Sequence, residues 1–522
     1  MLKREIERII TNSLSKSDIG FSSEIVLEAP RFVEHGDYAT NVAFQLAKTL
    51  KRSPMEIADK VCGILNQDSG FSELGKASPL NGFVNIALNN QGLWTRFFAW
   101  SVDKMDFPES DDRFLVEYVS ANPTGPLHIG HGRWAVIGSS LVHLLKRVGI
   151  KADSEFYIND AGNQVNLFYA SVTGVRDGKG VPENGYHGAY IAELAKSDQD
   201  PLQAMLTSQR QVLKGLGVEF DEWFKESSLI QPQINNVERA ISELKGLGFI
   251  YESEGAVWFK STDFGDDKDR VVIKADGSYT YFASDIAYHY TKLTRGYTRL
   301  VNLFGADHHG YVHRIKACVK AFKGINFVDD VTFKVIIGQL VNLFRDGQPV
   351  RMSKRTGDMI MLEDVMDEIG VDATRYFLLE KSPDTHLDFD LSLAVKQSSD
   401  NPVFYVQYAY ARICNILSKL DDGQLNAIKK DGIELSPSER DVVLEVLRFE
   451  DVIWHSALQL SPHKVVHYTY ILAKSFHLFY EFNPILRAEP HQQAQRIIIL
   501  KQLQLVFKEC FGILGISAPQ SM

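Results

Sequence analysis

The sequence predicts an α/β protein in three parts: an α+β unit over residues 1–108, a parallel-sheet unit over 109–385 and an all-α bundle over 386–522. Helical and strand patterns mix in the first part, strands and helices alternate in the second, and helical patterns fill the third almost throughout. The length of 522 residues allows three or four domains with a large buried core.

The first part combines short helices with strands. Helical patterns cover residues 1–14, 41–51 and 54–65, and residues 82–88 indicate a strand. A charged cluster at 108–113 follows and is typical of a linker.

Strand candidates at 114–119, 300–304 and 331–337 alternate with helices in the second part. This alternation favours a parallel sheet with right-handed crossovers, whose ligand is expected at the carboxyl ends of the strands. Residues from about 162 to 270 break the rhythm with long helical patterns, so we expect a mostly helical insertion there.

Helical patterns in the third part cover 403–420, 437–457, 461–482 and 492–511, which predicts a helical bundle. Residues 461–522 carry six Lys or Arg against three Glu, an excess of +3. Such an excess suits phosphate binding, but it is also typical of a solvated helix face.

The composition is that of an ordinary soluble globular protein, with 45% hydrophobic and 23% charged residues. Charges interrupt the longest apolar runs, and charged and apolar residues alternate from the first residue onward, so we expect neither a transmembrane helix nor a signal peptide. Cys62, Cys318, Cys414 and Cys510 form no Cys-x-x-Cys pair, which indicates thiols in a reducing cytoplasm and no structural zinc. The net charge of −10 argues mildly against a general nucleic-acid binder.

A strand, a tight turn and a helix are expected in succession over residues 114–149. The apolar pattern of 114–119 ends in the chain breakers of 122–126, and a helical pattern begins at His131 or Gly132. The free N–H groups of a first helical turn and the helix dipole both favour a negative ligand. This junction therefore predicts an anion site.

His128, Gly130, His131 and Gly132 occupy the junction. Glycines let a phosphate approach the backbone, and the two imidazoles point to the same place. A plainer alternative is a pair of histidines that caps an ordinary helix. We favour a nucleotide triphosphate site, in which the imidazoles stabilise charge on the α-phosphate while a carboxylate attacks it and pyrophosphate leaves.

A basic loop and a histidine-rich turn lie further along the chain. Arg351, Lys354 and Arg355 stand in a glycine-flanked stretch that would fold over a triphosphate or form a solvated basic loop. Residues 305–311 follow a strand pattern and contain a carboxylate and two imidazoles. Since no further zinc ligand stands out at suitable spacing, we prefer a nucleotide or ribose contact, or a packing role, to a metal site.

Tyr281 and Asp285 stand four residues apart in a helical pattern and would share one helix face. A tyrosine ring above a carboxylate can hold a planar cation, which the carboxylate binds with two hydrogen bonds. The alternative is an ordinary pair on a helix surface.

Together these motifs resemble the bacterial arginyl-tRNA synthetases, a family of class I aminoacyl-tRNA synthetases, over essentially the whole chain. Residues 128–131 match the HIGH motif of class I enzymes, and residues 351–355 match their KMSKS loop. Segments that match the arginine members are 120–128, 157–164 and 305–310, with weaker matches at 34–41, 372–375 and 401–412. The resemblance implies a Rossmann-type catalytic domain with a helical insertion, an N-terminal domain that contacts tRNA and an anticodon-binding bundle.

The resemblance also implies roles for single residues. Those implied to be catalytic are His128, His131, Lys354 and Arg351. Those implied to bind arginine are Glu117, Ser120, Asn122, Tyr281 and Asp285, and those implied to bind ATP are Gly130, Gly132, Asp307, His308, Gly310, Met352 and Ser353. The family's loop begins with lysine where this chain has Arg351, so we give more weight to Lys354, because the two side chains bind phosphate differently.

The implied reaction has two steps. The carboxylate of arginine attacks the α-phosphate of ATP, which enters with Mg²⁺, and the arginyl group then passes to the 3′ end of tRNA(Arg). Activation is expected only when tRNA is bound, and the protein is expected to be a cytoplasmic monomer with no membrane partner. Two rival functions are a small-molecule adenylyltransferase and an inactive relative that binds tRNA or arginine.

Overall fold

A parallel sheet of five strands forms the centre of the protein. The structure is a computed structural model, and it describes residues 2–19, 21, 25–30, 32–305, 311–323, 330–350, 360–420, 425, 427 and 432–522. The strand order is β14-β13-β5-β6-β7. Their bounds are Arg113–Glu117 for β5, Lys151–Ile158 for β6, Glu222–Lys225 for β7, Arg299–Gly305 for β13 and Thr332–Gly338 for β14. The predicted parallel sheet and its three predicted strands are thus confirmed.

The strand order reverses between β5 and β13, because the chain adds β6 and β7 on one side and β13 and β14 on the other. In a doubly wound sheet, a ligand binds at the carboxyl ends of the strands at such a reversal. Helix α6 (Ile129–Arg147) follows β5, α11 (Tyr281–Thr294) precedes β13, and α12 (Val312–Ala321) leads to β14. These three helices therefore surround the expected ligand position.

The segment from 162 to 270 differs from the mostly helical insertion that the sequence predicts. Its helices are α7 (Asn163–Arg176), α8 (Ala189–Lys196), α9 (Pro201–Gly215) and α10 (Asn236–Gly246). Strand β7 within it pairs in parallel with β6, so the segment contributes to the central sheet. It also holds the short pair β8 (Ile230–Gln231) and β9 (Ile234–Asn235) and the strands β10 (Ile250–Ser253) and β11 (Ala256–Phe259). These last two form an antiparallel sheet with β12 (Arg270–Ile273), which begins at the end of the segment.

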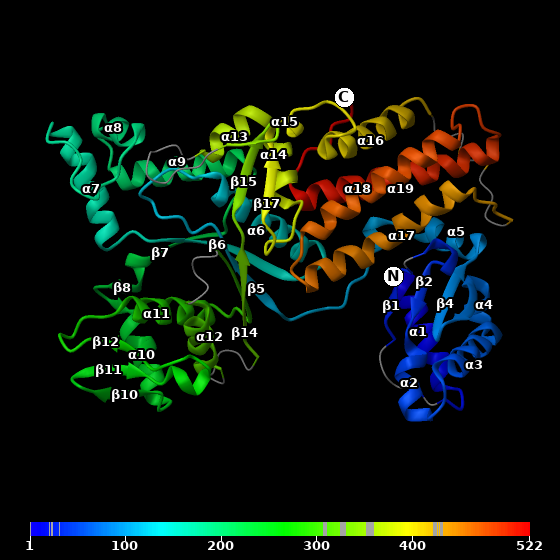
Figure 1. Ribbon diagram of the computed structural model, residues 1–522, viewed down its shortest axis with the longest axis horizontal. Helices are drawn as coiled ribbons and strands as arrows, with labels where there is room; N and C mark the ends of the chain where they lie inside the picture. Colours follow the sequence, from blue (N-terminus) through cyan, green and yellow to red (C-terminus); the bar gives the residue numbers. More distant parts are fainter. Residues whose placement is uncertain are drawn as a thin grey trace.

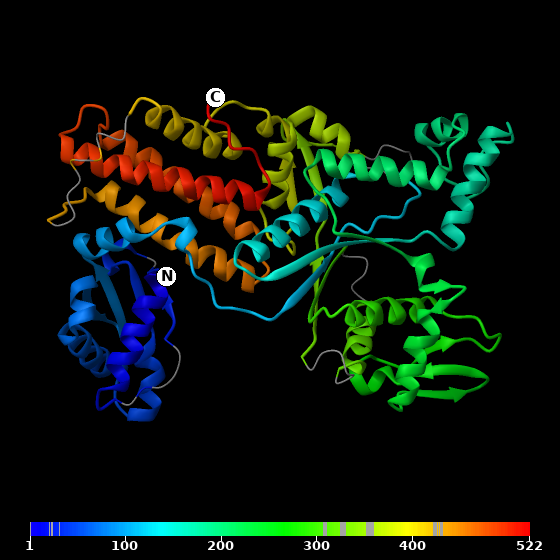
Figure 2. The same ribbon diagram turned by 180° about the vertical axis from the view of Figure 1, so that it is seen from behind.

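Before the central sheet, helices pack on an antiparallel sheet with strand order β1-β2-β4-β3. Its strands are β1 (Leu27–Glu28), β2 (Tyr38–Thr40), β3 (Gly75–Leu80) and β4 (Phe83–Leu88), and its helices are α1 (Leu2–Ser15), α2 (Val42–Leu50), α3 (Pro54–Gln67), α4 (Ser69–Leu74) and α5 (Asn90–Ala99). This part lies below α17 at one end of the molecule, and the β10–β12 sheet lies below the other end (Figures 1 and 2). Asp37 ties it to the bundle, since its carboxylate accepts two hydrogen bonds from Arg440, at 2.8 and 2.6 Å.

After the central sheet, a small sheet and short helices lead to the bundle. These elements are β15 (Val341–Arg345), β16 (Gln348–Pro349), β17 (Leu387–Asp390), α13 (Leu362–Ile369), α14 (Val371–Leu379) and α15 (Leu391–Ala394). The predicted helical bundle is confirmed as α16 (Pro402–Leu417), α17 (Pro437–Leu458), α18 (His463–Phe482) and α19 (Pro490–Leu514). Four single turns of 3-10 helix complete the described elements: Val33–His35, Val102–Lys104, Glu226–Leu229 and Ser261–Phe264.

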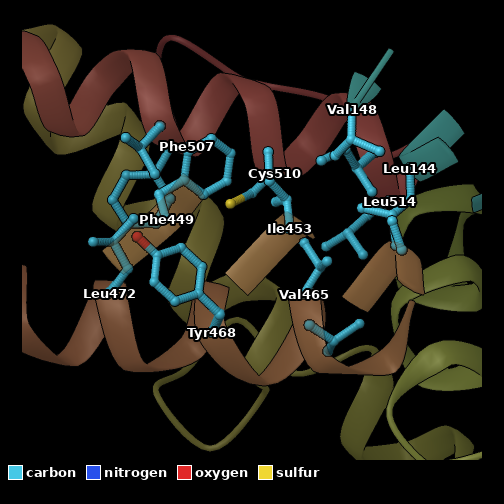
Figure 3. Packing of buried hydrophobic residues seen from close by; sticks show 14 of the residues in the cluster. Leu144, Val148, Phe449, Ile453, Val465, Tyr468, Leu472, Phe507, Cys510 and Leu514 are labelled. Carbon is cyan, nitrogen blue, oxygen red and sulfur yellow. The ribbon is translucent and has the colours of Figure 1, made fainter. Parts of the chain in front are cut away.

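The core of the bundle continues into α6. Figure 3 shows Phe449, Tyr468 and Phe507 from α17, α18 and α19 packed together, with Leu144 of α6 at the same core. Helix α6 thus joins the cavity side of the sheet to the bundle. None of the helices in the described ranges combines the length and apolarity needed to cross a membrane.

Candidate active site

A cavity of about 650 Å³ opens at the carboxyl ends of β5 and β13, where the strand order reverses. The residues that line it are Glu117, Val119, Ser120, Ala121, Asn122, His128, Gly130, His131, Trp134, Tyr157, Asp285, Tyr288, His289, Asn302, Leu303, Phe304, Gly305, Tyr311, Ile315, Gly338, Gln339 and Leu340. The sheet topology thus places the cavity where a doubly wound fold binds its ligand.

The chain leaves β5 through a strained turn. Val119 has φ +67° and Ser120 has φ +41°, and the Ser120 N–H donates to the carbonyl of Tyr118 at 2.9 Å, as in a γ-turn. A β-branched residue rarely adopts such a φ, and strain of this kind persists mainly at functional sites. The turn directs Ser120 and Asn122 to the cavity.

Hydrogen bonds fix both of these side chains. Ser120 Oγ accepts the N–H of Tyr157 at 3.1 Å and donates to Oε1 of Glu117 at 3.4 Å. Asn122 Nδ2 donates to Oε1 of Gln164 at 2.7 Å. Glu117, Ser120 and Asn122, to which the resemblance gives an arginine-binding role, therefore lie on one wall.

The start of α6 lies next to this turn. The helix begins at Ile129, so the prediction of a start at His131 or Gly132 is wrong. His128 is the N-cap residue, and its Nδ1 accepts the N–H of Gly130 at 3.1 Å. His131 Nδ1 accepts the N–H of His128 at 3.2 Å, and the two rings stack with centroids 3.7 Å apart.

The capping interpretation of the two histidines and the anion-site interpretation are compatible. Both imidazoles cap the helix and both line the cavity, together with Gly130. The helix start directs free N–H groups and the positive end of its dipole to the same space. Gly132 faces elsewhere, since a Cβ there would lie 2.5 Å from Leu362 of α13.

Asp285 of α11 also lines the cavity, and the Tyr311 hydroxyl donates a hydrogen bond to its carboxylate. Burial raises the pKa of Asp285 to about 7, and the nearby carboxylates Glu226 and Glu117 add to this, whereas the Tyr311 bond and Lys292 act in the opposite direction. A cation in the cavity would restore the charged form. Asp285 is thus a matching partner for a guanidinium group.

Tyr281 does not line the cavity beside Asp285. It is the first residue of α11, as the predicted helix requires, but its side chain is 78% exposed and the cavity is lined by Tyr157, Tyr288 and Tyr311 instead. The sequence analysis assigned no site role to these three tyrosines, although Tyr157 begins the segment 157–164 and Tyr311 ends the segment 305–311. They come from β6, α11 and the residue before α12, and only the fold brings them together.

A tight contact forms the wall near α6. Trp134 lies one turn beyond His131, and a Cβ on Gly338 at the end of β14 would stand 1.5 Å from its ring. Arg133 is fully buried and donates to the carbonyls of Gln339, Ser382 and Thr385 at 2.7, 3.0 and 2.9 Å. Sequence reasoning missed this wall, although a glycine at the end of a predicted strand was an available signal.

Seven of the sequence-predicted site residues lie outside the described part of the chain: Asp307, His308, Gly310, Arg351, Met352, Ser353 and Lys354. Within the described part, no group of three or more His, Cys, Asp and Glu side chains is placed to hold a metal ion. The described site therefore consists of the β5 turn, the α6 start, α11, Tyr311 and the end of β14.

Three family models match the chain. Residues 4–88 match the arginyl tRNA synthetase N-terminal domain, residues 189–413 the catalytic domain of class I (R) tRNA synthetases, and residues 406–522 the DALR anticodon-binding domain. These ranges follow the order of the three parts of the fold.

Similar proteins cover the full length. An arginine–tRNA ligase of Shouchella clausii is 38% identical over 100% of this chain and 99% of its own length, and one of Listeria monocytogenes is 41% identical over 96% and 94%. The solved Thermus thermophilus arginyl-tRNA synthetase matches 100% of both chains with a TM-score of 0.81 at 21% identity, which shows the shared fold. By its matching domains and its full-length similarity, the chain belongs to the arginyl-tRNA synthetase family.

Proposed function

We propose that the protein is an arginine–tRNA ligase, which uses ATP to activate L-arginine and transfers the arginyl group to the 3′ end of tRNA(Arg). One observation carries the proposal: a single cavity joins a carboxylate wall with Asp285 to a helix start with His128 and His131. The first wall suits a guanidinium group and the second suits a phosphate.

The first step is a displacement at phosphorus. Asp285 holds the guanidinium group, so that the carboxylate of arginine lies toward the start of α6, where the α-phosphate of ATP is bound. A bond forms between a carboxylate oxygen and the α-phosphorus, and the bond to the bridging oxygen of pyrophosphate breaks. His128 and His131 stabilise the charge that builds up on the phosphate oxygens, and no covalent enzyme intermediate is needed.

ATP is bound as a substrate, with Mg²⁺ as the counter-ion of its phosphates. Lys354 adds a second cation to the leaving pyrophosphate, with Arg351, Met352 and Ser353 in the same loop, and Asp307, His308 and Gly310 contact the nucleotide. These assignments rest on the family's motifs in the sequence. The wall of Trp134 and Gly338 suits the planar base of the nucleotide, since a flat ring already packs there against backbone.

The second step transfers the arginyl group to the 2′-hydroxyl of the terminal adenosine, with AMP as the leaving group. We assign residues 1–108 to tRNA contact and residues 386–522 to the anticodon; the description of the C-terminal family model supports the second assignment. We further propose a cytoplasmic monomer; Cys62, Cys318, Cys414 and Cys510 are all buried free thiols.

Arginine-dependent ATP–pyrophosphate exchange tests the function. We expect exchange when a tRNA(Arg) transcript is present and little or none without it, because activation needs bound tRNA in this proposal. Absence of exchange with every tRNA tested would contradict the enzyme, and binding of tRNA without exchange would point to an inactive relative. Exchange with a different amino acid or a small phosphorylated acceptor would point to another adenylyltransferase.

A further inference from the structure

A row of polar side chains crosses the centre of the parallel sheet beneath the carboxylate wall of the cavity. Glu117 of β5 is in register with Asn302 of β13 on one side and with Glu155 of β6 on the other. The three residues are 5%, 1% and 0% exposed. The inside of a parallel sheet is usually apolar, and a buried carboxylate is costly unless a cation or donor faces it.

Helix α11 supplies the balancing groups. Lys292 has no exposed surface, and its Nζ lies 2.5 Å from Oε2 of Glu117 and 3.8 Å from Oε1 of Glu155. One helical turn earlier, the Tyr288 hydroxyl lies 2.6 Å from Oε1 of Glu155 and 3.1 Å from Oε2 of Glu117. Arg295 pairs with the other oxygen of Glu155 at 2.6 Å. Two cations thus face two carboxylates.

The two oxygens of Glu117 have different surroundings. Oε2 receives Lys292, the Asn302 amide at 2.8 Å and the Tyr288 hydroxyl. Among the described residues, Oε1 receives one long hydrogen bond, 3.4 Å, from Ser120 Oγ. Glu117 lines the cavity, whereas Lys292 is covered beneath it. Lys292 can therefore influence a ligand in the cavity only through its neighbours.

We propose that Lys292 is a positioning residue for arginine: it holds Glu117 by Oε2 and so presents Oε1 to the substrate at a fixed place. This inference rests on the proposed function. A cation gains most from a carboxylate that is already oriented, and a displacement of about 1 Å in such a site can cost about 10²-fold in activity. Asp285 and the preorganised carboxylate of Glu117 would then bind arginine together. The positive charges of Lys292 and Arg295 offset the negative charges of Glu117 and Glu155.

Lys292→Met tests the role, because methionine has similar length and no charge. We expect the KM for arginine in tRNA-dependent exchange to rise by about 10²-fold, with the KM for ATP within about twofold of wild type. Arg295→Met is the matched control: it removes the other cation of the cluster, which faces Glu155 rather than Glu117, and should leave both KM values within about threefold. Parallel rises in both KM values for Lys292→Met would indicate a merely structural role and overturn the proposal.

A double-mutant cycle shows whether Lys292 acts through Glu117. Glu117→Gln and the double variant Glu117→Gln, Lys292→Met should have equal arginine KM values, because Lys292 then has no Glu117 carboxylate to orient. Additive effects would overturn the proposal. If Lys292→Met does not fold, Lys292→Gln, which keeps a hydrogen-bond donor, replaces it in the cycle. The KM for arginine is again expected to rise. Wild-type protein without any exchange would contradict the proposed function itself, so the two failures are distinguishable.

Discussion

The two ends of the cavity are built from different chemistry. At the proposed arginine end, two carboxylates line the cavity, Asp285 from α11 and Glu117 from β5, and Lys292 is buried beneath Glu117. At the nucleotide end, the start of α6 offers backbone N–H groups and two capping imidazoles, and Gly338 packs against Trp134. In the proposed function, fixed side-chain charge recognises a cation and the end of a helix recognises a phosphate.

This difference explains why substitutions at the two ends should have different effects on substrate binding. A carboxylate can be neutralised by one atom change without altering its shape. A helix start keeps its backbone N–H groups in every substitution except one by proline, so the nucleotide end is sensitive mainly to shape and to the two histidines. The following variants separate the two ends.

Asp285→Asn should have the largest effect. Loss of one partner of a buried ion pair costs about 3–5 kcal/mol, which corresponds to about a 10³-fold rise in the KM for arginine, while the KM for ATP should change little. Exchange kinetics with each substrate varied in turn measure both. Asp153→Asn is a matched control, because Asp153 also accepts a tyrosine hydroxyl, that of Tyr297 at 2.9 Å, away from the cavity. Equal rises in both KM values for Asp285→Asn would refute the assignment.

His128→Asn should separate catalysis from capping. Asparagine is among the best N-cap residues, so the stability of α6 should be kept. Loss of a preorganised donor to the developing phosphate charge should lower kcat by about 10²-fold. Thermal unfolding and the exchange rate are measured on the same sample. A wild-type kcat would leave His128 with the capping role alone.

Gly338→Ala should disturb the nucleotide end by shape. The new Cβ would stand 1.5 Å from the Trp134 ring, so the ring must move. Overpacking of this kind costs about 1–3 kcal/mol, and we expect about a tenfold rise in the KM for ATP with a smaller change for arginine. Adding Trp134→Leu should remove the clash and restore part of the thermal stability that Gly338→Ala loses. No recovery in the double variant would show that the clash is not the cause.

The pH dependence of arginine binding should be the mildest effect. Burial raises the pKa of Asp285 to about 7, and the guanidinium group binds the ionised form. Below that pH, arginine must displace a proton, so its KM should rise as the pH falls, by about threefold from pH 7.5 to 6.5. Asp285→Asn should show no such rise, and a wild-type KM that falls with falling pH would contradict the sign.

Much of the fold was predictable because its signals are local. The strands β5, β13 and β14 and the helices of the bundle have clear periodicity in the sequence. The β10–β12 sheet was missed because its hairpin turns through Glu254 and Gly255, with φ +54° and +75°, and this pair is a weaker turn signal than Asn-Gly or Asp-Gly. Strand β7 was missed because four residues between helices give little alternation.

The site residues also divide into those with a local sequence signal and those that only the fold brings together. Ser120, Asn122, His128 and His131 were predictable because one continuous segment carries them. Tyr311 and Lys292 were not, because only the sheet register and the packing of α11 bring them next to Asp285 and Glu117. The start of α6 was misplaced because histidine is not a common N-cap, although its Nδ1 accepts a backbone N–H here as the usual caps do.

The most direct measurement compares both KM values in Asp285→Asn and Gly338→Ala under one tRNA-dependent exchange assay. The two-ended cavity predicts a crossed result: the KM for arginine rises mainly in Asp285→Asn, and the KM for ATP rises mainly in Gly338→Ala. If both variants raise the same KM, or each raises both equally, the cavity is not divided into an arginine end and a nucleotide end.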